Sequence, residues 1–391
     1  MKRINFGELR LGEETKKNLL NCVETDWASA GPKVQMFESN WGNIFGYKYN
    51  KAVSSGTDAV LNLISSVYDY GAERGDEVIV PALSFIATSN AVLMAGLTPV
   101  FVDIEKETLN IDPSKIEEAI TPKTRAIMVV HTMGRPCDMD AINEIAWKHD
   151  LLVFEDSCEA HGATYKDRYI GNLSDGAAFS FYTAHLINCG EGGMVSTNNE
   201  KVATSVGSTR SHGRIEGSKY FNHVRVGYNS KMNDLEASIG LEGISCFWDT
   251  FNKRHDFLLE LIECTNPYKR FAWFSEEPED MEVCPHGFSI TVKDSDYLIP
   301  LQEALDAANI EWKRNFGCIP TQHDAYKFMN HSLGDFPNSE YVGDYGIHIG
   351  THHYLTFEDQ KTIKETLVSF FKSLESSLTQ EVLWKENTYR L

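Results

Sequence analysis

Residues 125–156, RAIMVVHTMGRPCDMDAINEIAWKHDLLVFED, contain the pattern that decides the fold. Residues 125–131 and 151–155 are short apolar runs, and residues 139–149 between them place apolar side chains at helical spacing. The order is strand, helix, strand, and both strands are almost continuously apolar. This pattern indicates parallel strands whose sheet is covered by helices on both faces. The stretch therefore predicts an α/β protein with a mainly parallel, seven-stranded type of sheet.

The same alternation extends outward from this stretch, from about residue 50 to residue 200. Further strands are expected at residues 77–81, 99–103, 177–182 and 193–197, and further helices at residues 57–70 and 85–95. Residues 236–262 are helical in pattern, and the remainder mixes a strand at 287–292 with helices at 298–308 and 357–376. We therefore expect a large domain over residues 1–245, which includes an N-terminal arm, and a smaller α+β domain over residues 246–391.

Composition excludes several classes of protein. The formal net charge of −20 argues against a nucleic-acid partner, because phosphate backbones require a basic surface. The polar N-terminus and the absence of an 18-residue apolar run indicate neither a signal peptide nor a membrane span, so a cytoplasmic protein is expected. The eight cysteines form no C-x-x-C pair, and the histidines of HIGTHH (348–353) have no matching carboxylate or cysteine, so no disulfide, metal site or iron–sulfur cluster is expected.

Polar features follow several of the expected strands. SSGTDA (54–59) opens a helix and could hold a phosphate, although such a cluster is more often an N-cap. Phe85, in PALSF (81–85), could stack on a heteroaromatic ring or simply pack in the core. Asp156 and Glu159, in FEDSCEAHG (154–162), could pair with a protonated ring nitrogen or form a structural cap.

The fourth feature is His185, which follows a strand and precedes the glycine-rich turn of residues 190–193. A lone histidine is usually structural, but glycine-rich loops at strand ends approach ligands closely. Ligands of parallel sheets bind at the carboxyl ends of the strands, so one ligand could contact all four features.

The order of these motifs resembles the nucleotide-sugar aminotransferase and dehydratase family (DegT type), which has the fold type I architecture of pyridoxal phosphate (PLP) enzymes. The resemblance runs from residue 31 to at least residue 240. The stretches that carry it are SSGTDA (54–59), PALSFIAT (81–88), HTMGRPCDMD (131–140), EDSCEAHGA (155–163), SFYTAH (180–185), GEGGMVST (190–197) and GYNSKMNDLEASIG (227–240).

The resemblance implies a role for each matching residue around the cofactor. The cofactor phosphate would be bound by Gly56, Thr57, Asp58 and Ser180. Phe85 would stack on the pyridine ring, Asp156 would keep the ring nitrogen protonated, and Glu159 would occupy the position that contacts the ring hydroxyl. Asn229 would reach the phosphate of the neighbouring subunit, which implies a homodimer with shared active sites.

His185 departs from the family pattern, because the aminotransferases carry there the lysine that binds the cofactor covalently. Imidazole cannot form that bond, so PLP and its amine form, pyridoxamine phosphate (PMP), would be held non-covalently. The subgroup with histidine at this position comprises the sugar 3-dehydratases, of which the cluster-free branch acts on GDP-4-keto-6-deoxymannose. Two alternatives stay open: a 4-aminotransferase of the perosamine-synthase type with its lysine replaced, and a non-catalytic nucleotide-sugar-binding protein.

The resemblance implies a nucleotide-linked keto sugar as substrate, GDP-linked by preference, in deoxysugar biosynthesis of the kind that supplies lipopolysaccharide O-antigen. It also implies an amino donor such as glutamate. Further candidate substrate contacts, each of which could equally be a solvated surface residue, are Trp27, Arg210, His212, Arg214, His223, Arg225, Arg314, His348, His352 and His353.

Overall fold

The computed structural model describes residues 3–388, with side chains described as far as residue 376. Its centre is a seven-stranded sheet in the order β1-β9-β8-β5-β4-β2-β3. The strands are β1 (Tyr49–Val53), β2 (Glu77–Pro81), β3 (Thr98–Val102), β4 (Thr124–Val130), β5 (Leu152–Asp156), β8 (Gly176–Ser180) and β9 (Gly193–Thr197). Five of them, β3, β2, β4, β5 and β8, are parallel neighbours, whereas β9 runs antiparallel to both β8 and β1. The predicted mainly parallel sheet is confirmed.

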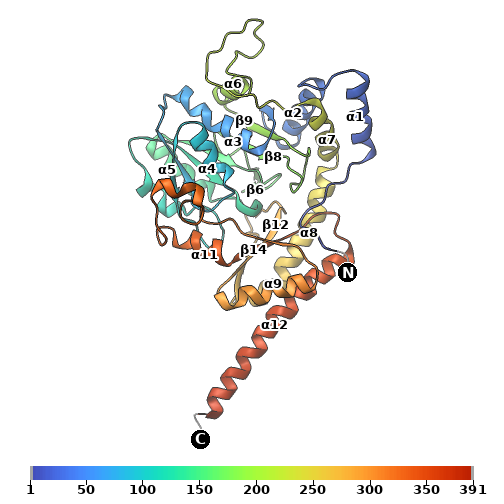
Figure 1. Ribbon diagram of the computed structural model, residues 1–391, viewed down its shortest axis with the longest axis vertical. Helices are drawn as coiled ribbons and strands as arrows, with labels where there is room; N and C mark the ends of the chain where they lie inside the picture. Colours follow the sequence, from blue (N-terminus) through green and yellow to red (C-terminus); the bar gives the residue numbers. More distant parts are fainter. Residues whose placement is uncertain (1–2, 389–391) are drawn as a thin grey trace.

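Helices cover both faces of this sheet (Figure 1). The core on one face contains side chains of α2 (Pro32–Phe45), α5 (Met139–His149) and α7 (Asp234–Ser245). The core on the other face contains side chains of α3 (Gly56–Ser65), α4 (Ala87–Met94) and α6 (Glu200–Thr209). Both faces of the sheet are therefore buried, which explains why the sequences of the central strands are almost continuously apolar.

The small domain is built on a second sheet with the order β10-β12-β14-β13. Its strands are β10 (Ala272–Phe274), β12 (Gly287–Val292), β13 (Trp312–Arg314) and β14 (Gly346–Gly350), and its helices include α8 (Phe247–Thr265), α9 (Leu298–Ala307), α11 (Pro337–Tyr345) and α12 (Phe357–Thr388). Of these, α8, α9 and α12 pack together in the domain core.

The helical pattern predicted at 236–262 is interrupted, because α7 ends at Ser245 and α8 begins at Phe247. Cys246 between them has φ −111° and ψ 16°, outside the helical region. Phe247 and Phe251 pack in the core of the large domain, whereas Leu258 and Leu261 pack in that of the small domain. Helix α8 thus connects the two cores.

The N-terminal arm lies between the domains. Ile4 pairs with Ile310 beside β13, and the backbone N–H of Phe6 donates to the Glu311 carboxylate at 2.8 Å. A Cβ added to Gly350 on β14 would come within 2.1 Å of the Phe6 carbonyl oxygen, so the arm is packed directly on the small sheet. Within the described residues, none of the helices combines the length and apolar character that a bilayer span requires.

Candidate active site

A cavity of about 1370 Å³, counting its open mouth, lies where the carboxyl ends of β5 and β8 face the small domain. All four strand-end features predicted from the sequence contribute to its lining. The predicted site residues in the lining are Gly56, Thr57, Phe85, Asp156, Glu159, Ser180 and His185. Asp58 and Asn229 are not among the lining residues.

One end of the cavity is formed by the first turn of α3. Ser55 is the N-cap of this helix and its hydroxyl accepts from the Asp58 N–H at 3.1 Å, while the carboxylate of Asp58 is bound by the hydroxyl of Ser54. A Cβ on Gly56 would lie 2.5 Å from the Cβ of Ser180, so only glycine permits this approach. The first amides of a helix have no partner within the helix, so this cradle suits a phosphate.

Asp156 lies at the end of β5 and is 7% exposed. Its Oδ2 accepts from the Thr88 hydroxyl at 2.7 Å, and its Oδ1 accepts from the Cys158 N–H at 3.3 Å. Phe85, by contrast, is 61% exposed and presents its ring at the cavity. A fixed carboxylate and an uncovered aromatic face beside a phosphate cradle fit a phosphorylated, protonated pyridine ring.

His185 lies in the turn after β8, and its Nδ1 is enclosed without a hydrogen-bond partner. Its ring centroid is 5.6 Å from that of His161 and 5.1 Å from that of His286. Arg254 of α8 donates to the His185 carbonyl at 3.4 Å. Burial, with the nearby Arg254 guanidinium, lowers the pKa of His185 to about 3, so the imidazole is neutral at physiological pH.

Glu159 connects this cluster to the β4–α5 loop. Its Oε2 accepts from the Met133 N–H at 2.7 Å, and its Oε1 lies 3.4 Å from Nε2 of His286. Burial, with a smaller contribution from nearby Asp156, raises the pKa of Glu159 to about 7 although the backbone hydrogen bond from Met133 lowers it.

The sequence interpretation missed several residues of the cavity. Phe6 comes from the N-terminal arm, His286 immediately precedes β12, and Lys313 and Phe316 come from β13 and the loop after it. Lys313 is the one lysine of the lining, and its ammonium lies 4.4 Å from the centre of the Phe6 ring. Only His286, an imidazole before an apolar strand, gave a local signal that could have been noticed.

Of the candidate substrate contacts, Arg314 and His348 line the cavity. The other candidates lie outside its lining: Trp27, Arg210, His212, Arg214, His223, Arg225, His352 and His353. In the part of the chain that the structure describes, no three His, Cys, Asp or Glu side chains are grouped to hold a metal.

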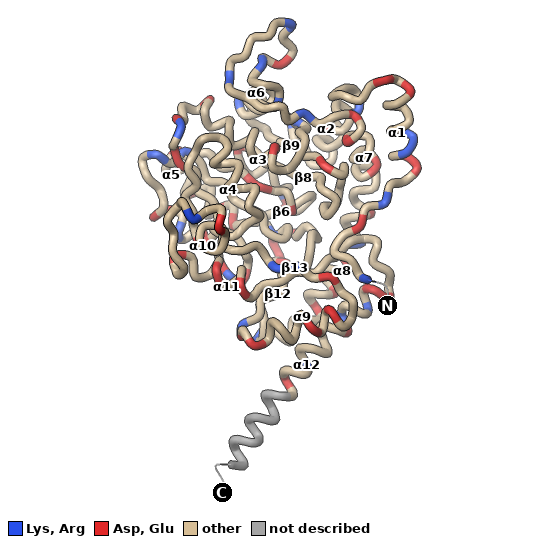
Figure 2. The backbone as a smooth tube through the Cα atoms, viewed as in Figure 1, with Lys and Arg blue, Asp and Glu red and all other residues tan. Residues whose placement is uncertain are grey.

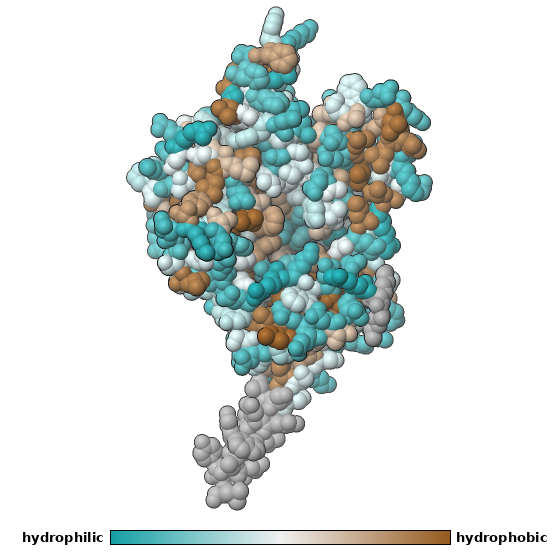
Figure 3. Space-filling view, viewed as in Figure 1, coloured by the Kyte–Doolittle hydropathy of each residue, from teal (hydrophilic) through white to brown (hydrophobic). Residues whose placement is uncertain are grey.

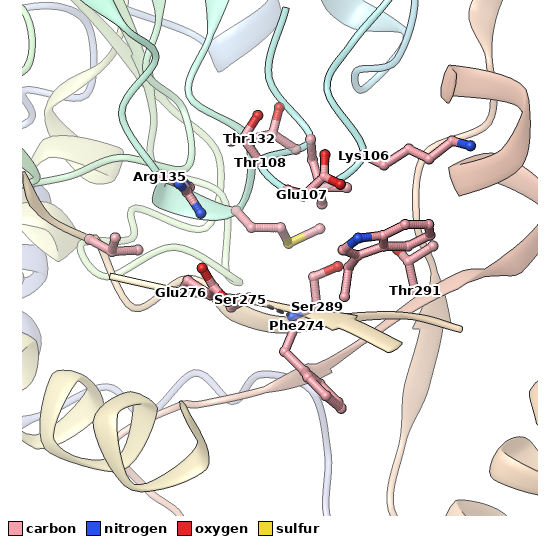
Figure 4. A pocket seen from close by; sticks show the side chains of 14 residues that line it. Lys106, Glu107, Thr108, Thr132, Arg135, Phe274, Ser275, Glu276, Ser289 and Thr291 are labelled. Carbon is pink, nitrogen blue, oxygen red and sulfur yellow. Dashed lines mark hydrogen bonds between the residues drawn. The ribbon is translucent and has the colours of Figure 1, made fainter. Parts of the chain in front are cut away.

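A separate, smaller crevice lies between the domains (Figure 4). Thr132 and Arg135 of the large domain face Ser289 and Thr291 of β12 across it. The hydroxyls of Thr132 and Thr291 and Nε of Arg135 are buried without partners there. These groups are suited to a bridging water between the domains, and no reactive arrangement is present.

Comparison with known proteins identifies the family to which this chain belongs. The model of the DegT/DnrJ/EryC1/StrS aminotransferase family matches residues 10–368. A GDP-perosamine synthase of Escherichia coli O157:H7 is 32% identical over 95% of this chain and 99% of its own length. A GDP-4-keto-6-deoxy-D-mannose 3-dehydratase of Yersinia pseudotuberculosis is 30% identical over 90% and 94%.

The structural comparison agrees. A crystal structure of a GDP-4-keto-6-deoxymannose 3-dehydratase variant with bound GDP-perosamine superposes with a TM-score of 0.85. The two chains are 27% identical, and the match covers 93% of this chain and 100% of the other. The fold is therefore that of fold type I PLP enzymes, and the cofactor is PLP or PMP. The chain belongs to the DegT/DnrJ/EryC1/StrS aminotransferase family of nucleotide-sugar-modifying enzymes.

Proposed function

We propose that this protein is a PMP-dependent 3-dehydratase that converts a nucleotide-linked 4-keto-6-deoxyhexose into a 3-deoxy sugar. One observation carries the proposal. The cavity retains a phosphate cradle, a ring-facing carboxylate and an open aromatic face, but presents the imidazole of His185 where the family has its covalent lysine. The site is therefore suited to bind the cofactor without a covalent bond and to move protons with a histidine.

The binding roles follow from the contacts. Gly56, Thr57 and Ser180 would hold the cofactor phosphate, and Phe85 would cover one face of its ring. Asp156, fixed by Thr88, would keep the ring nitrogen protonated. When bound, PMP supplies the amine that joins the sugar ketone and a ring that accepts an electron pair.

The proton transfers fall to His185. Because its imidazole is neutral and enclosed, it would remove a proton from the cofactor carbon C4′ as a general base. The resulting imidazolium would then protonate the hydroxyl that leaves sugar carbon C3. The C3 hydroxyl would leave as water, and water would be taken up again in the hydrolysis that releases ammonia and PLP. The net change is a sugar lighter by one oxygen, with PMP converted into PLP and ammonia. An amino donor such as glutamate would return PLP to PMP.

The mouth of the cavity suggests how a nucleotide would be bound. Lys313 and Arg314 bring two positive charges to the lining from β13, and Phe316 follows them. A diphosphate would find its countercharge there, and Phe316 offers an apolar surface for a base. The similarity to two GDP-sugar enzymes favours a guanine nucleotide.

The site would be completed by a second copy of the chain. Asn229 is exposed and lies outside its own cavity, beside the loop of residues 211–228. This loop protrudes from the body after α6 (Figure 1), carries several Lys and Arg residues (Figure 2), and exposes Tyr220, Phe221 and Val226. A second apolar area covers α1 (Glu13–Glu24; Figure 3), where Leu20 and Val23 are exposed. We infer a homodimer in which Asn229 reaches the partner's phosphate site.

The test is a single-turnover reaction of purified protein, PMP and GDP-4-keto-6-deoxymannose. We expect stoichiometric ammonia, a change of the absorbance spectrum from PMP to PLP, and a sugar product lighter by one oxygen. His185→Asn should bind PMP and release no ammonia. A product that carries an amino group, formed without ammonia, would refute the dehydratase.

That outcome would favour the second candidate, a sugar 4-aminotransferase whose lysine has been replaced. The observation in its favour is the similarity to GDP-perosamine synthase along almost the whole chain. Binding of PMP and of the nucleotide sugar without any reaction would instead indicate a non-catalytic binding protein.

A further inference from the structure

Protonation of His185, the proposed base, is electrostatically unfavourable. When His185 takes up a proton, its charge is created in an enclosed cluster that already contains the Arg254 guanidinium. The titratable and charged groups around it include His161, His286, His348, Arg254, Asp156 and Glu159, and the same cavity is also lined by Glu191, Lys313 and Arg314. Among the carboxylates, Glu159 contacts one of the imidazole rings, that of His286.

Four buried ring nitrogens in the cluster lack partners: both nitrogens of His161, Nδ1 of His185 and Nδ1 of His286. The His185 ring lies nearer to the His286 ring than to the His161 ring, so His286 is the nearer partner for His185. Nδ1 of His185 and Nδ1 of His286 are both enclosed and unpaired. The ring centroids are 5.1 Å apart, close enough for a rotation of the two rings to bring these atoms within hydrogen-bonding distance. A hydrogen bond between them would satisfy both atoms at once.

The other nitrogen of His286 decides the direction of that bond. Nε2 of His286 lies 3.4 Å from Oε1 of Glu159. Above the Glu159 pKa of about 7 this carboxylate is ionised and only accepts, so in that pH range Nε2 carries the proton. Nδ1 of neutral His286 is then an acceptor. Nδ1 of His185 must therefore be the donor, which leaves the lone pair of its Nε2 for the cavity.

We propose that Glu159 and His286 are positioning residues for His185, holding its imidazole in the Nδ1–H tautomer so that Nε2 is the base that faces the cofactor. The inference rests on the proposed function, because it assigns the atom that performs the proton transfer. It also explains how the charge is tolerated. Imidazolium His185 would donate to neutral His286, which in turn donates to the Glu159 carboxylate, so the new charge is bonded through one ring to an anion.

Glu159→Gln tests this arrangement with almost no change in shape. The Met133 N–H donates to Oε2 of Glu159, so a glutamine would keep its oxygen there and turn its amide N–H₂ toward His286. His286 would then have to accept at Nε2 and carry its proton on Nδ1. His185 would in turn have to accept at Nδ1, and its Nε2 would lose the lone pair that acts as the base.

The measurement is a long-range ¹⁵N–¹H spectrum of histidine-labelled protein at about pH 8.5, above the Glu159 pKa of about 7, with the His185 signals assigned by His185→Asn. We expect the Nδ1–H tautomer at His185 and the Nε2–H tautomer at His286 in the parent protein, and both reversed in Glu159→Gln. His286→Phe should release His185 into a mixture of tautomers. An unchanged His185 tautomer in both variants would overturn the proposal, whatever happens to the activity.

A matched control is available in the same chain. Glu277 also accepts from a backbone N–H, that of Val283 at 2.7 Å, and also pairs with a histidine, His255 at 2.6 Å, but it is not part of the cavity lining. Glu277→Gln should leave the His185 tautomer and ammonia release unchanged. Glu159→Gln should lower kcat for ammonia release at least about tenfold with little change in KM. Because the spectra need neither PMP nor sugar, a parent protein that releases no ammonia would refute the proposed function while the tautomers still decide this inference.

Discussion

Gly56→Ala is the sharpest test of where the cofactor phosphate lies. An added Cβ would meet the Cβ of Ser180 at 2.5 Å, its Oγ at 2.8 Å and Sγ of Cys158 at 3.2 Å. The nearest of these atoms belongs to a residue at the end of a central strand, β8, which cannot swing away as a flexible side chain would. Overpacking of this kind costs about 1–3 kcal/mol, which the protein can relieve by moving the first turn of α3 away from β8.

That movement separates the amides of Gly56 and Thr57 from the Ser180 hydroxyl, so PMP affinity should fall together with stability. If the strain is relieved at the cradle, about 1.4 kcal/mol corresponds to a tenfold weaker Kd, and we expect a loss of about ten- to a hundredfold. Kd would be measured by absorbance titration with PMP, and the free energy of unfolding by urea denaturation of the apoprotein.

The control is Gly243→Ala on α7, where the nearest atom to an added Cβ is a methyl group of Ile187 at 3.2 Å. Alanine favours a helix by about 1 kcal/mol over glycine, so this variant should be as stable as the parent and bind PMP equally well. A Gly56→Ala protein that is destabilised but binds PMP within twofold of the parent would show that the phosphate is bound elsewhere.

Three further variants test the rest of the site. Asp156→Asn should lower turnover by about 10²–10³-fold, since the ring loses its fixed carboxylate, and a normal rate of ammonia release would contradict the assigned role. His185→Lys should form a reducible covalent adduct with PLP, detectable by mass spectrometry after borohydride treatment; no adduct would mean that residue 185 does not face the cofactor carbon. Burial raises the pKa of Glu159 from an ordinary 4.5 to about 7, so between these pH values the folded state holds a proton there that the unfolded state has lost. Stability of the apoprotein should therefore fall by up to about 3 kcal/mol as pH rises from 4.5 to 7, and Glu159→Gln should remove that part of the pH dependence in urea denaturation. Identical pH profiles for the two proteins would contradict a buried Glu159 that stays protonated up to about pH 7.

The sheet could be predicted from the sequence because its strands are short apolar runs separated by amphipathic helices. The observed ends of β2, β9 and β12 coincide with the predicted ranges, and β5 is displaced by one residue. Strand β1 was not predicted, because Tyr49, Asn50 and Lys51 mix polarity and the strand is recognised only by its antiparallel pairing with β9. The break at Cys246 was missed for a similar reason, since helix-forming residues lie on both sides of it.

The residues of the site also fall into two groups: those that a local sequence pattern indicates, and those that only the long-range packing of the chain brings to the site. Strand-end residues could be found because the topology of a parallel sheet brings the carboxyl ends of its strands together. Arg254, His286 and Lys313 come from distant segments, and no local pattern indicates that α8 or the small sheet faces His185. The direction in which Glu159 points was equally inaccessible, since it depends on the Met133 N–H and on His286.

The surroundings of residue 185 explain how one position can serve two chemistries. Burial and the Arg254 guanidinium favour the neutral form of a basic side chain at residue 185. They would lower the pKa of a lysine amine there as they lower the pKa of the imidazole. A neutral amine in this pocket would attack the cofactor carbon, whereas a neutral imidazole can only accept a proton from it. A catalytic histidine differs from a histidine that has merely replaced the lysine in one respect. It needs hydrogen-bonded neighbours that stabilise the positive charge of the imidazolium. In the proposed arrangement Glu159 and His286, which also line the cavity, supply that stabilisation through Nδ1 of His185, so the histidine and its two neighbours act as one unit. A protein that had merely lost its lysine would have no need of a carboxylate at residue 159, and exchange of that single oxygen for nitrogen would leave its chemistry untouched.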